Sequence, residues 1–247
     1  MHTTVHALVL REVNYKDSDK ILTLFTREEG KRTVKARGCR KKGSLLAAAA
    51  QLLVYSEMTM FELRGFTQVT EAESLNQFWG VRGELEKLAL ASYFAETAEV
   101  ISEEGQPDEA LLSLLLNTLF VLNKPQAARI LIKSVYELRL MCLSGYAPML
   151  RNCAVCGAGE PEAAQLNLSD GVLHCAHCRA QVGGSISLPL SPPALAAMRH
   201  VVYGAEKHCF SFTLAEPALS QMAQVCEAFL MTQLERGFHT LDFYKGL

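Results

Sequence analysis

The stretch CAVCGAGEPEAAQLNLSDGVLHCAHC, residues 153–178, carries the strongest structural signal in the chain. It contains two cysteine doublets, Cys153 with Cys156 and Cys175 with Cys178, in the pattern C-x2-C-x18-C-x2-C. This spacing is typical of a zinc site with four thiolate ligands. Two residues between paired cysteines allow a tight turn that aims both sulfurs at one ion, and Gly157 gives the first turn the necessary freedom. The stretch therefore predicts one metal ion held by all four cysteines.

The segment between the doublets predicts a β-hairpin. Residues 165–169 and 172–174 flank Asp170-Gly171, a dipeptide suited to a two-residue hairpin turn. The hairpin carries the second doublet back beside the first, as in a zinc ribbon. Because four thiolates complete a tetrahedral shell and leave no position for an activated water, one structural Zn²⁺ is expected.

Two other interpretations of the cysteines remain open. His174 or His177 can replace one cysteine in a closed ligand set of different charge. Alternatively, the cysteines bind no metal, although a hairpin this small buries too little apolar surface to fold alone. Half of the eight cysteines lie in the two doublets, which favours metal binding in a reducing compartment over a secreted disulfide framework.

Ahead of the cysteines, residues 1–78 are predicted to form a small β-barrel. Between the third and fourth strands, Ser44 begins a Leu/Ala-rich stretch, residues 44–51, that is expected to be a short helix. Five strands with a helix at this position are the element order of an oligonucleotide-binding (OB) barrel. The β-prone segments are residues 5–13, 21–26, 31–38, 52–63 and 66–73.

A helical domain is predicted over residues 79–150 and 188–247, with the zinc ribbon, residues 151–187, inserted into it. Apolar side chains recur there at helical spacing, and proline and glycine mark the ends of several helices. The predicted helices are residues 83–101, 108–122, 125–145, 191–204 and 216–237. The expected fold class is therefore α+β: an N-terminal five-stranded OB-type β-barrel, then an all-α domain with an inserted zinc ribbon of four cysteine ligands.

The net charge of −2 conceals a basic N-terminal region. Residues 1–73 contain 12 Lys and Arg against 9 Asp and Glu, and residues 27–42 alone contain 8 against 2. Alternation along a strand places Lys31, Thr33, Lys35 and Arg37 on one face. The pattern indicates a polyanion partner, with phosphates the natural ligands, and the alternative is a solvated charged face without a partner. Candidates for base stacking, although more often core residues, are Tyr15, Phe25, Tyr55, Phe61 and Phe66.

The sequence has no motif of a catalytic or nucleotide-binding site. Neither G-x-S-x-G nor G-x-G-x-x-G occurs, and Gly30-Lys31 is followed by Arg32 rather than the Ser or Thr of a phosphate-binding loop. No catalytic residues are therefore expected. Apolar runs such as residues 111–122 are shorter than the roughly 20 residues of a membrane-spanning helix, and residues 1–17 lack the pattern of a signal peptide. A cytoplasmic location is expected.

Three segments together resemble the bacterial recombination mediator RecO family. They are ALVLREVNYKDSDKILTLFT at 7–26, GKRTVKARGCRKK at 30–42 and ELRLMCLSGYAPMLRNCAVCG at 137–157. The last is the most specific, because it joins a buried helix to the first cysteine doublet. The resemblance extends over essentially the whole chain. Some members of the family lack the cysteines, so the metal does not define the activity.

The resemblance implies a non-enzymatic mediator of DNA repair and homologous recombination. It implies binding of single- and double-stranded DNA and annealing of complementary strands. It also implies that the protein, with RecR, helps to load RecA onto DNA coated by single-stranded-DNA-binding protein, whose acidic C-terminal tail it contacts. Such a protein works in the bacterial cytoplasm and associates with the nucleoid during repair.

The resemblance also implies that the motif at 30–42 carries the DNA contacts. Arg32 is the weakest of them, because alternation turns it inward. The competing function is a zinc-ribbon factor of transcription or translation that binds RNA or polymerase. A third possible function is a zinc-stabilised enzyme, but the sequence lacks a set of catalytic residues for it. The DNA-contact candidates are Lys31, Arg32, Lys35, Arg37, Arg40, Lys41 and Lys42.

Overall fold

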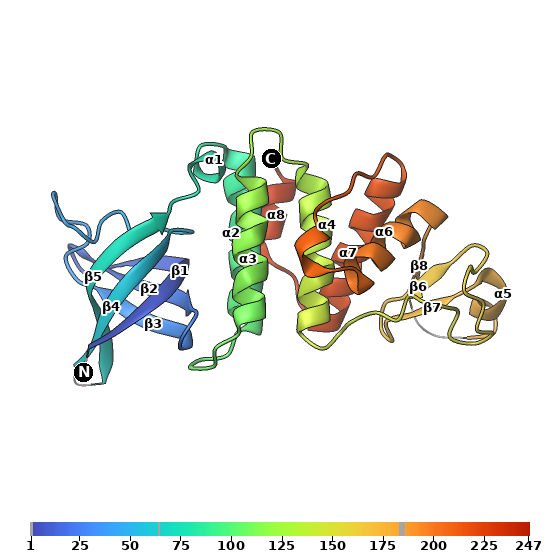
Figure 1. Ribbon diagram of the computed structural model, residues 1–247, viewed down its shortest axis with the longest axis horizontal. Helices are drawn as coiled ribbons and strands as arrows, with labels where there is room; N and C mark the ends of the chain where they lie inside the picture. The colour runs from blue at the N-terminus through green and yellow to red at the C-terminus, as the bar shows by residue number, and fades with distance from the viewer. Residues whose placement is uncertain (1, 64, 183–185) are drawn as a thin grey trace. The chain divides into compact units, whose positions relative to one another are not determined.

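The structure is a computed structural model that describes residues 2–63, 65–182 and 186–247, apart from the side chain of Leu63. The chain forms two compact units (Figure 1). The first consists of Met1–Pro125 with Phe238–Leu247, and the second of Gln126–Gly237. The basic region therefore belongs to the first unit, and the four paired cysteines belong to the second.

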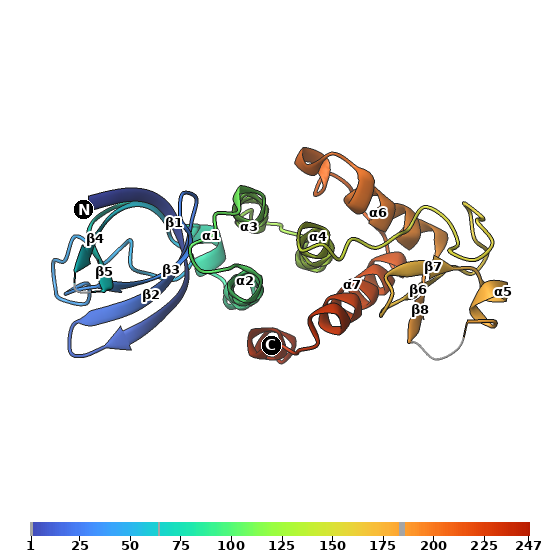
Figure 2. The same cartoon turned by 90° about the horizontal axis from the view of Figure 1, so that it is seen from below.

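The first unit contains a closed barrel of five strands. They are β1 (His2–Tyr15), β2 (Asp19–Thr26), β3 (Gly30–Ala36), β4 (Tyr55–Leu63) and β5 (Phe66–Asn76), in the order β1-β2-β3-β5-β4. Neighbouring strands are antiparallel except β3 and β5, which are parallel and pair through Lys35 with Gln68 and Ala36 with Val69. Figure 2 shows the strands curving around the barrel. The predicted OB-type barrel is confirmed.

Alternation along the strands builds the barrel core. Val5, Ala7 and Val9 of β1 are buried, as are Val34 and Ala36 of β3. Because successive side chains of a strand point to opposite faces, the intervening residues of β3 face outward and are open to solvent contact. The apolar face of β3 thus holds the strand in the barrel while its other face carries polar and cationic groups.

The helix predicted over residues 44–51 is wrong. This segment is a series of turns, with hydrogen bonds from Ala47 N to Ser44 O (3.2 Å) and from Ala50 N to Leu46 O (2.9 Å). The Ser44 hydroxyl accepts a hydrogen bond from Leu46 N at 3.3 Å instead of capping a helix. Leu46, Ala49 and Ala50 are buried in the barrel core. Tertiary burial of these three side chains outweighs the weak local preference for a helix.

Four helices complete the part of the first unit that the structure describes. They are α1 (Trp79–Arg82), α2 (Leu85–Ile101), α3 (Glu109–Leu122) and α8 (His239–Lys245). The predictions for residues 83–101 and 108–122 are confirmed, and the Asp108 carboxylate caps α3 by accepting a hydrogen bond from Leu111 N at 2.9 Å. Helix α8 contacts α2, and the rings of Tyr93 and Phe238 lie 5.6 Å apart, edge to face. Helices α1 and α8 are too short to show a clear period in the sequence.

The second unit is built on three mutually contacting helices, α4 (Arg129–Leu143), α6 (Pro192–Tyr203) and α7 (Ala218–Leu234). The predicted start at Pro125 is wrong, because this proline lies in a turn and the first helical hydrogen bond runs from Ile132 N to Ala128 O (2.9 Å). Proline suits a turn as well as a first helical turn, so its position alone does not mark the start.

A small ribbon extends from the helices of the second unit. Its sheet has the order β7-β6-β8, with β6 (Gln165–Asn167), β7 (Val172–His174) and β8 (Ser187–Pro189). The predicted hairpin is confirmed, with Gly171 in the turn at a φ of 65°. The ribbon also contains α5 (Ala176–Arg179), and the short 3-10 helix η1 (Glu206–His208) follows α6.

The predicted domain ranges are 1–78, 79–150 with 188–247, and 151–187. They include residues 1, 64 and 183–185, which lie outside the described residues. The two compact units divide the chain at other positions, because α2, α3 and α8 group with the barrel. The ranges stay a prediction. None of the described helices is both long enough and apolar enough to span a membrane.

Candidate nucleic-acid interface and candidate metal centre

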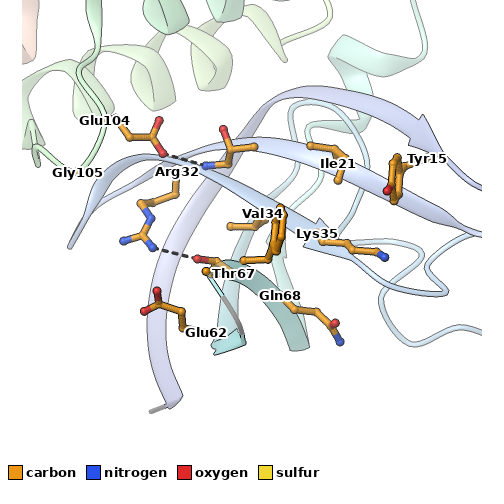
Figure 3. A pocket seen from close by; sticks show the side chains of 13 residues that line it. Tyr15, Ile21, Arg32, Val34, Lys35, Glu62, Thr67, Gln68, Glu104 and Gly105 are labelled. Atoms are coloured by element: carbon orange, nitrogen blue, oxygen red, sulfur yellow. Dashed lines mark hydrogen bonds between the residues drawn. The ribbon is translucent and has the colours of Figure 1, made fainter.

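A groove opens in the barrel wall beside the part of β3 that is not paired with β5 (Figure 3). Its volume is about 930 Å³. Two aromatic side chains at the groove, Tyr15 and Phe66, are 41% and 75% exposed. Proteins that bind single-stranded nucleic acids combine exposed aromatic rings, on which bases stack, with cations that neutralise phosphates. We call this feature the barrel groove; its lining includes Tyr15, Arg32, Val34, Lys35, Phe66 and Glu104.

Arg32 lies along the barrel groove and does not enter the core. Its guanidinium donates to Glu29 Oε2 at 2.7 Å and to Thr67 Oγ1 at 3.1 Å, so that it reaches from β3 toward β5 (Figure 3). The side chain is half-buried. Alternation places it on the same face as Val34, but the barrel wall is open at this end of β3, so that face borders the groove.

Lys35 borders the groove next to an aromatic ring. Its ammonium lies 2.9 Å from Asp19 Oδ2 and 5.0 Å from the centre of the Tyr15 ring. The hydrogen bond from Lys35, followed by that from Gly38 N–H, lowers the pKa of Asp19 below its ordinary value of 3.8. Lys16, which the sequence did not single out, also lies 5.4 Å from the Tyr15 ring. Tyr15 is thus contacted by two ammonium groups.

The segment after β3, residues 37–42, forms what we call the basic loop. Arg37, Arg40, Lys41 and Lys42 of this loop are all exposed. Arg37 and Lys41, together with Lys35, line a cavity of about 350 Å³, which we call the Arg37 cavity. The structure therefore gathers cations from β3 and from the loop around one hollow.

Lys31 occupies a different position from the other candidates. Its ammonium donates to the backbone carbonyl of Glu99 at 2.9 Å and also to that of Ser102. These carbonyls lie at the C-terminal end of α2, where a cation complements the helix dipole. Lys31 thus fastens the barrel to α2, whereas the other predicted cations border the groove or project from the basic loop.

The loop between α2 and α3 lies against the open edge of β3, a contact that the sequence did not predict. Gly105 N donates to Lys31 O at 3.1 Å, and the Glu104 carboxylate accepts a hydrogen bond from Thr33 N at 3.3 Å. Lys31 and Glu104 form an isolated parallel bridge. A carboxylate therefore stands at one end of the barrel groove (Figure 3).

The four cysteines of the second unit form a compact cluster. Their sulfurs all lie within 4.8 Å of one another, and those of Cys156 and Cys175 are 3.9 Å apart. Four sulfurs placed about 2.3 Å from a central ion at tetrahedral angles are separated by about 3.8 Å. The sulfur positions and the chemistry of the donor set therefore fit a metal ion. Among the described residues, this cluster includes neither His174 nor His177.

Local backbone geometry shapes the first cysteine turn. Gly157 N donates to Cys153 O at 2.9 Å, and Gly157 has a φ of 76°, a left-handed conformation that favours glycine. Cys175 N donates to the sulfur of Cys153 at 3.4 Å. The hairpin therefore brings the second doublet against the first, as the sequence predicted.

The environment of the thiols favours a bound cation. Burial raises the pKa of Cys153, but hydrogen bonds from the N–H groups of Cys156, Cys175 and Val155 help to lower it to about 6. Hydrogen bonding with Cys175, together with burial, raises the pKa of Cys178 to about 12. Cysteines bind a metal as thiolates, so a metal ion at this cluster takes the place of the thiol protons.

Arg199 of α6 anchors the segment of the first cysteine doublet to the helices. Its guanidinium donates to the carbonyls of Leu150 (2.7 Å), Arg151 (2.9 Å) and Gly159 (2.6 Å). These carbonyls lie on either side of the first cysteine doublet. Sequence reasoning missed Arg199, because the three acceptors are backbone atoms that leave no signature in the residue types.

The geometry defines a class of protein: an OB-type barrel with a cationic groove, joined to helices that carry a four-cysteine ribbon. Residues 1–78 match the family model described as "Recombination protein O N terminal", and residues 82–242 match "Recombination protein O C terminal". The chain belongs to the RecO family of DNA repair proteins.

Relatives named DNA repair protein RecO are similar over most of the chain. The protein from Acetivibrio thermocellus is 31% identical, covering 97% of this chain and 95% of the relative. The protein from Symbiobacterium thermophilum is 30% identical over 98% of this chain and 96% of its own length. The protein from Rubrobacter xylanophilus is 33% identical over 78% of each chain.

Proposed function

We propose that this chain is a non-catalytic recombination mediator that binds single- and double-stranded DNA through its barrel. The observation that carries the proposal is the exposed row Arg37, Arg40 and Lys41, next to a groove with the exposed rings of Tyr15 and Phe66. Cations of this kind neutralise phosphates, and aromatic rings stack on bases without regard to sequence. Binding is therefore expected to be strong, salt-dependent and largely independent of base sequence.

The seven predicted cations take different parts in this proposal. Residues of the basic loop, with Lys35, contact phosphates, because Lys35, Arg37 and Lys41 line the Arg37 cavity and the other cations of the loop are exposed. Arg32 meets the nucleic acid inside the groove. Lys31 positions β3 by holding it to α2.

Annealing and the partner proteins extend the same proposal. Cations that reduce the repulsion between two phosphate chains favour pairing of complementary strands. Membership of the RecO family supports a role, together with RecR, in loading RecA onto DNA coated by single-stranded-DNA-binding protein, and a contact with the acidic tail of that protein. We place this work in the bacterial cytoplasm, at the nucleoid. The ranges 1–78, 79–150 with 188–247, and 151–187 are proposed as the domains of the protein that carries out this function.

Cys153, Cys156, Cys175 and Cys178 are proposed to hold one structural Zn²⁺. A closed shell of four thiolates supplies folding energy to a small ribbon and no reactive position. The test is metal analysis of the purified protein, followed by proteolysis of the second unit before and after chelation. One zinc per chain and faster cleavage within residues 150–190 after chelation are expected. A metal-free protein of unchanged protease resistance contradicts the assignment.

DNA binding is tested by charge reversal in the basic loop. Neutralising about five phosphates on a single strand gives a slope of log affinity against log salt of about −3.5. Arg37→Glu is expected to weaken the binding of a fluorescent oligothymidine and to make this slope shallower. Lys207→Glu, an exposed cation of the second unit, is the matched control and should change neither.

The same assay separates the competing functions. A RecO-type mediator anneals complementary DNA oligonucleotides, whereas an RNA- or polymerase-binding factor prefers RNA of the same length. Preference for RNA, absence of annealing, or equal effects of Arg37→Glu and Lys207→Glu each count against the proposed function.

A further inference from the structure

A third cavity in the first unit shares Lys41 with the Arg37 cavity. It has a volume of about 690 Å³, and we call it the loop–helix cavity because the basic loop and helix α1 both contribute to it. Neither the sequence motifs nor the proposed DNA contacts account for the part of its lining that comes from outside the loop. The lining includes Glu12, Lys20, Arg40, Lys41, Gln51 and Arg82.

The charges of the loop–helix cavity are unbalanced. Lys20 donates to Glu12 Oε2 at 2.7 Å, and this ion pair accounts for the carboxylate of the lining. Three cations remain, Arg40, Lys41 and Arg82. Within the described ranges, the guanidinium of Arg40 has only long contacts of 3.4 Å, to the neutral carbonyls of two residues in the β1–β2 turn. The cavity is therefore suited to an anion.

Arg82 is the residue in the cavity that is built most specifically for a ligand. One nitrogen of its guanidinium donates to the side-chain oxygen of Gln51, and its Cζ lies 5.6 Å from the centre of the Trp79 ring. Its Nη1 is buried and has no hydrogen-bond partner among the described residues. Buried donors are nearly always satisfied, and phosphate oxygens accept from a guanidinium in a strong, charge-assisted geometry. Gln51 and Trp79 thus orient a charged guanidinium at the cavity, and its Nη1 has no acceptor among the described residues.

We propose that the loop–helix cavity binds phosphates of a second nucleic-acid strand, while the barrel groove and the Arg37 cavity hold the first. This inference rests on the proposed function and adds Arg82 to its binding residues. Lys41 lines both cavities, so its ammonium lies between the two phosphate chains and reduces their repulsion. Two complementary strands held at one loop meet at a high effective concentration, which is the physical requirement for annealing.

The test separates annealing from binding of one strand. Arg82→Gln is compared with wild-type protein for affinity toward a short fluorescent oligothymidine and for the rate at which it anneals two complementary oligonucleotides. Loss of a charge-assisted contact predicts an annealing rate about tenfold lower, with single-strand affinity within about twofold. Arg11→Gln removes a guanidinium from the same barrel, outside both cavities, and should leave both readouts unchanged.

A second variant guards against misfolding of Arg82→Gln. Gln51→Glu keeps the arginine in place and supplies it with a carboxylate partner, so the cavity loses its affinity for phosphate while α1 remains anchored. The same slowing of annealing is expected. Where Arg82→Gln does not fold, Gln51→Glu decides the question.

The outcomes distinguish this inference from the proposed function. Wild-type protein that does not bind the oligothymidine overturns the proposed function itself. Wild-type protein that binds but does not anneal overturns this inference and the annealing part of the function. Two results overturn the second-strand site alone. Normal annealing by Gln51→Glu makes Arg82 dispensable. A parallel loss of single-strand affinity and annealing places Arg82 on the path of the first strand.

Discussion

Removing one carboxylate at the end of the barrel groove should strengthen DNA binding. Glu104 accepts a hydrogen bond from Thr33 N at 3.3 Å, and its negative charge stands where a phosphate following β3 would pass. The variant Glu104→Gln keeps an oxygen that can accept the same hydrogen bond. It therefore removes the charge while preserving the contact that holds the α2–α3 loop against β3.

The size of the effect follows from Coulomb's law. Two unit charges about 4 Å apart repel by about 1 kcal/mol in water, and a tenfold change in affinity corresponds to about 1.4 kcal/mol. Glu104→Gln is therefore expected to tighten single-stranded DNA binding about fivefold at low salt. At about 0.1 M salt the Debye length is about 10 Å, and it shortens as more salt is added, so the gain should shrink as salt rises.

Fluorescence anisotropy of a short oligothymidine across a salt series measures this change. The matched control is Glu103→Gln, which removes the same charge from the neighbouring position, where the carboxylate contacts the side chain of Gln106 rather than β3. Equal gains from the two variants would mean that only the overall charge matters. That result, or no gain from Glu104→Gln, refutes the reasoning.

Three further predictions concern stability and the metal centre. Gly30→Ala should lower the free energy of unfolding by about 2 kcal/mol or more in urea denaturation, because φ is +65° and a Cβ would lie 1.9 Å from the carbonyl oxygen of Gln106. Gly43→Ala, at φ +78° with open space around it, should lower the free energy of unfolding by less, and equal losses in the two variants would contradict the clash. Arg199→Gln should make the proposed metal ion of the cysteine cluster leave to a chelator about tenfold faster, and an unchanged release rate would dismiss the anchoring role of Arg199. Because the pKa of Asp19 is lowered in the folded state, the carboxylate of Asp19 contributes fully to stability above about pH 3.8, and this contribution is lost as the pH falls below that value. Acid unfolding monitored by circular dichroism should show this loss in the wild type but not in Asp19→Asn.

The N-terminal barrel shows which secondary-structure elements local sequence patterns predict correctly and which they do not. The five strands were predictable because each segment is β-prone and is bounded by polar or glycine turns. The stretch after Ser44 has the composition of a helix but folds as turns, because Leu46 and its neighbours are placed by the barrel core. Composition indicates a local preference, whereas the available core decides whether that preference is realised.

The candidate interface was predicted as the seven cations of residues 31–42 together with candidate stacking rings that include Tyr15 and Phe66. Three of these cations took positions that alternation does not determine. Lys31 is held by the end of α2, Arg32 lies in the groove, and Lys35 pairs with Asp19 beside Tyr15. These partners come from other elements, so a single strand cannot reveal them.

The amino-acid sequence by itself determined the type of barrel, the hairpin and the grouping of four cysteines, because strand alternation and doublet spacing act over a few residues. Only the tertiary structure decided that Glu104 meets β3, that Arg199 holds the first cysteine doublet, and that Arg82 joins Arg40 and Lys41 in one cavity. Each of these groupings joins residues 40 or more positions apart along the sequence. Contacts at such separations depend on how whole elements pack, and no local pattern of residue types encodes that packing.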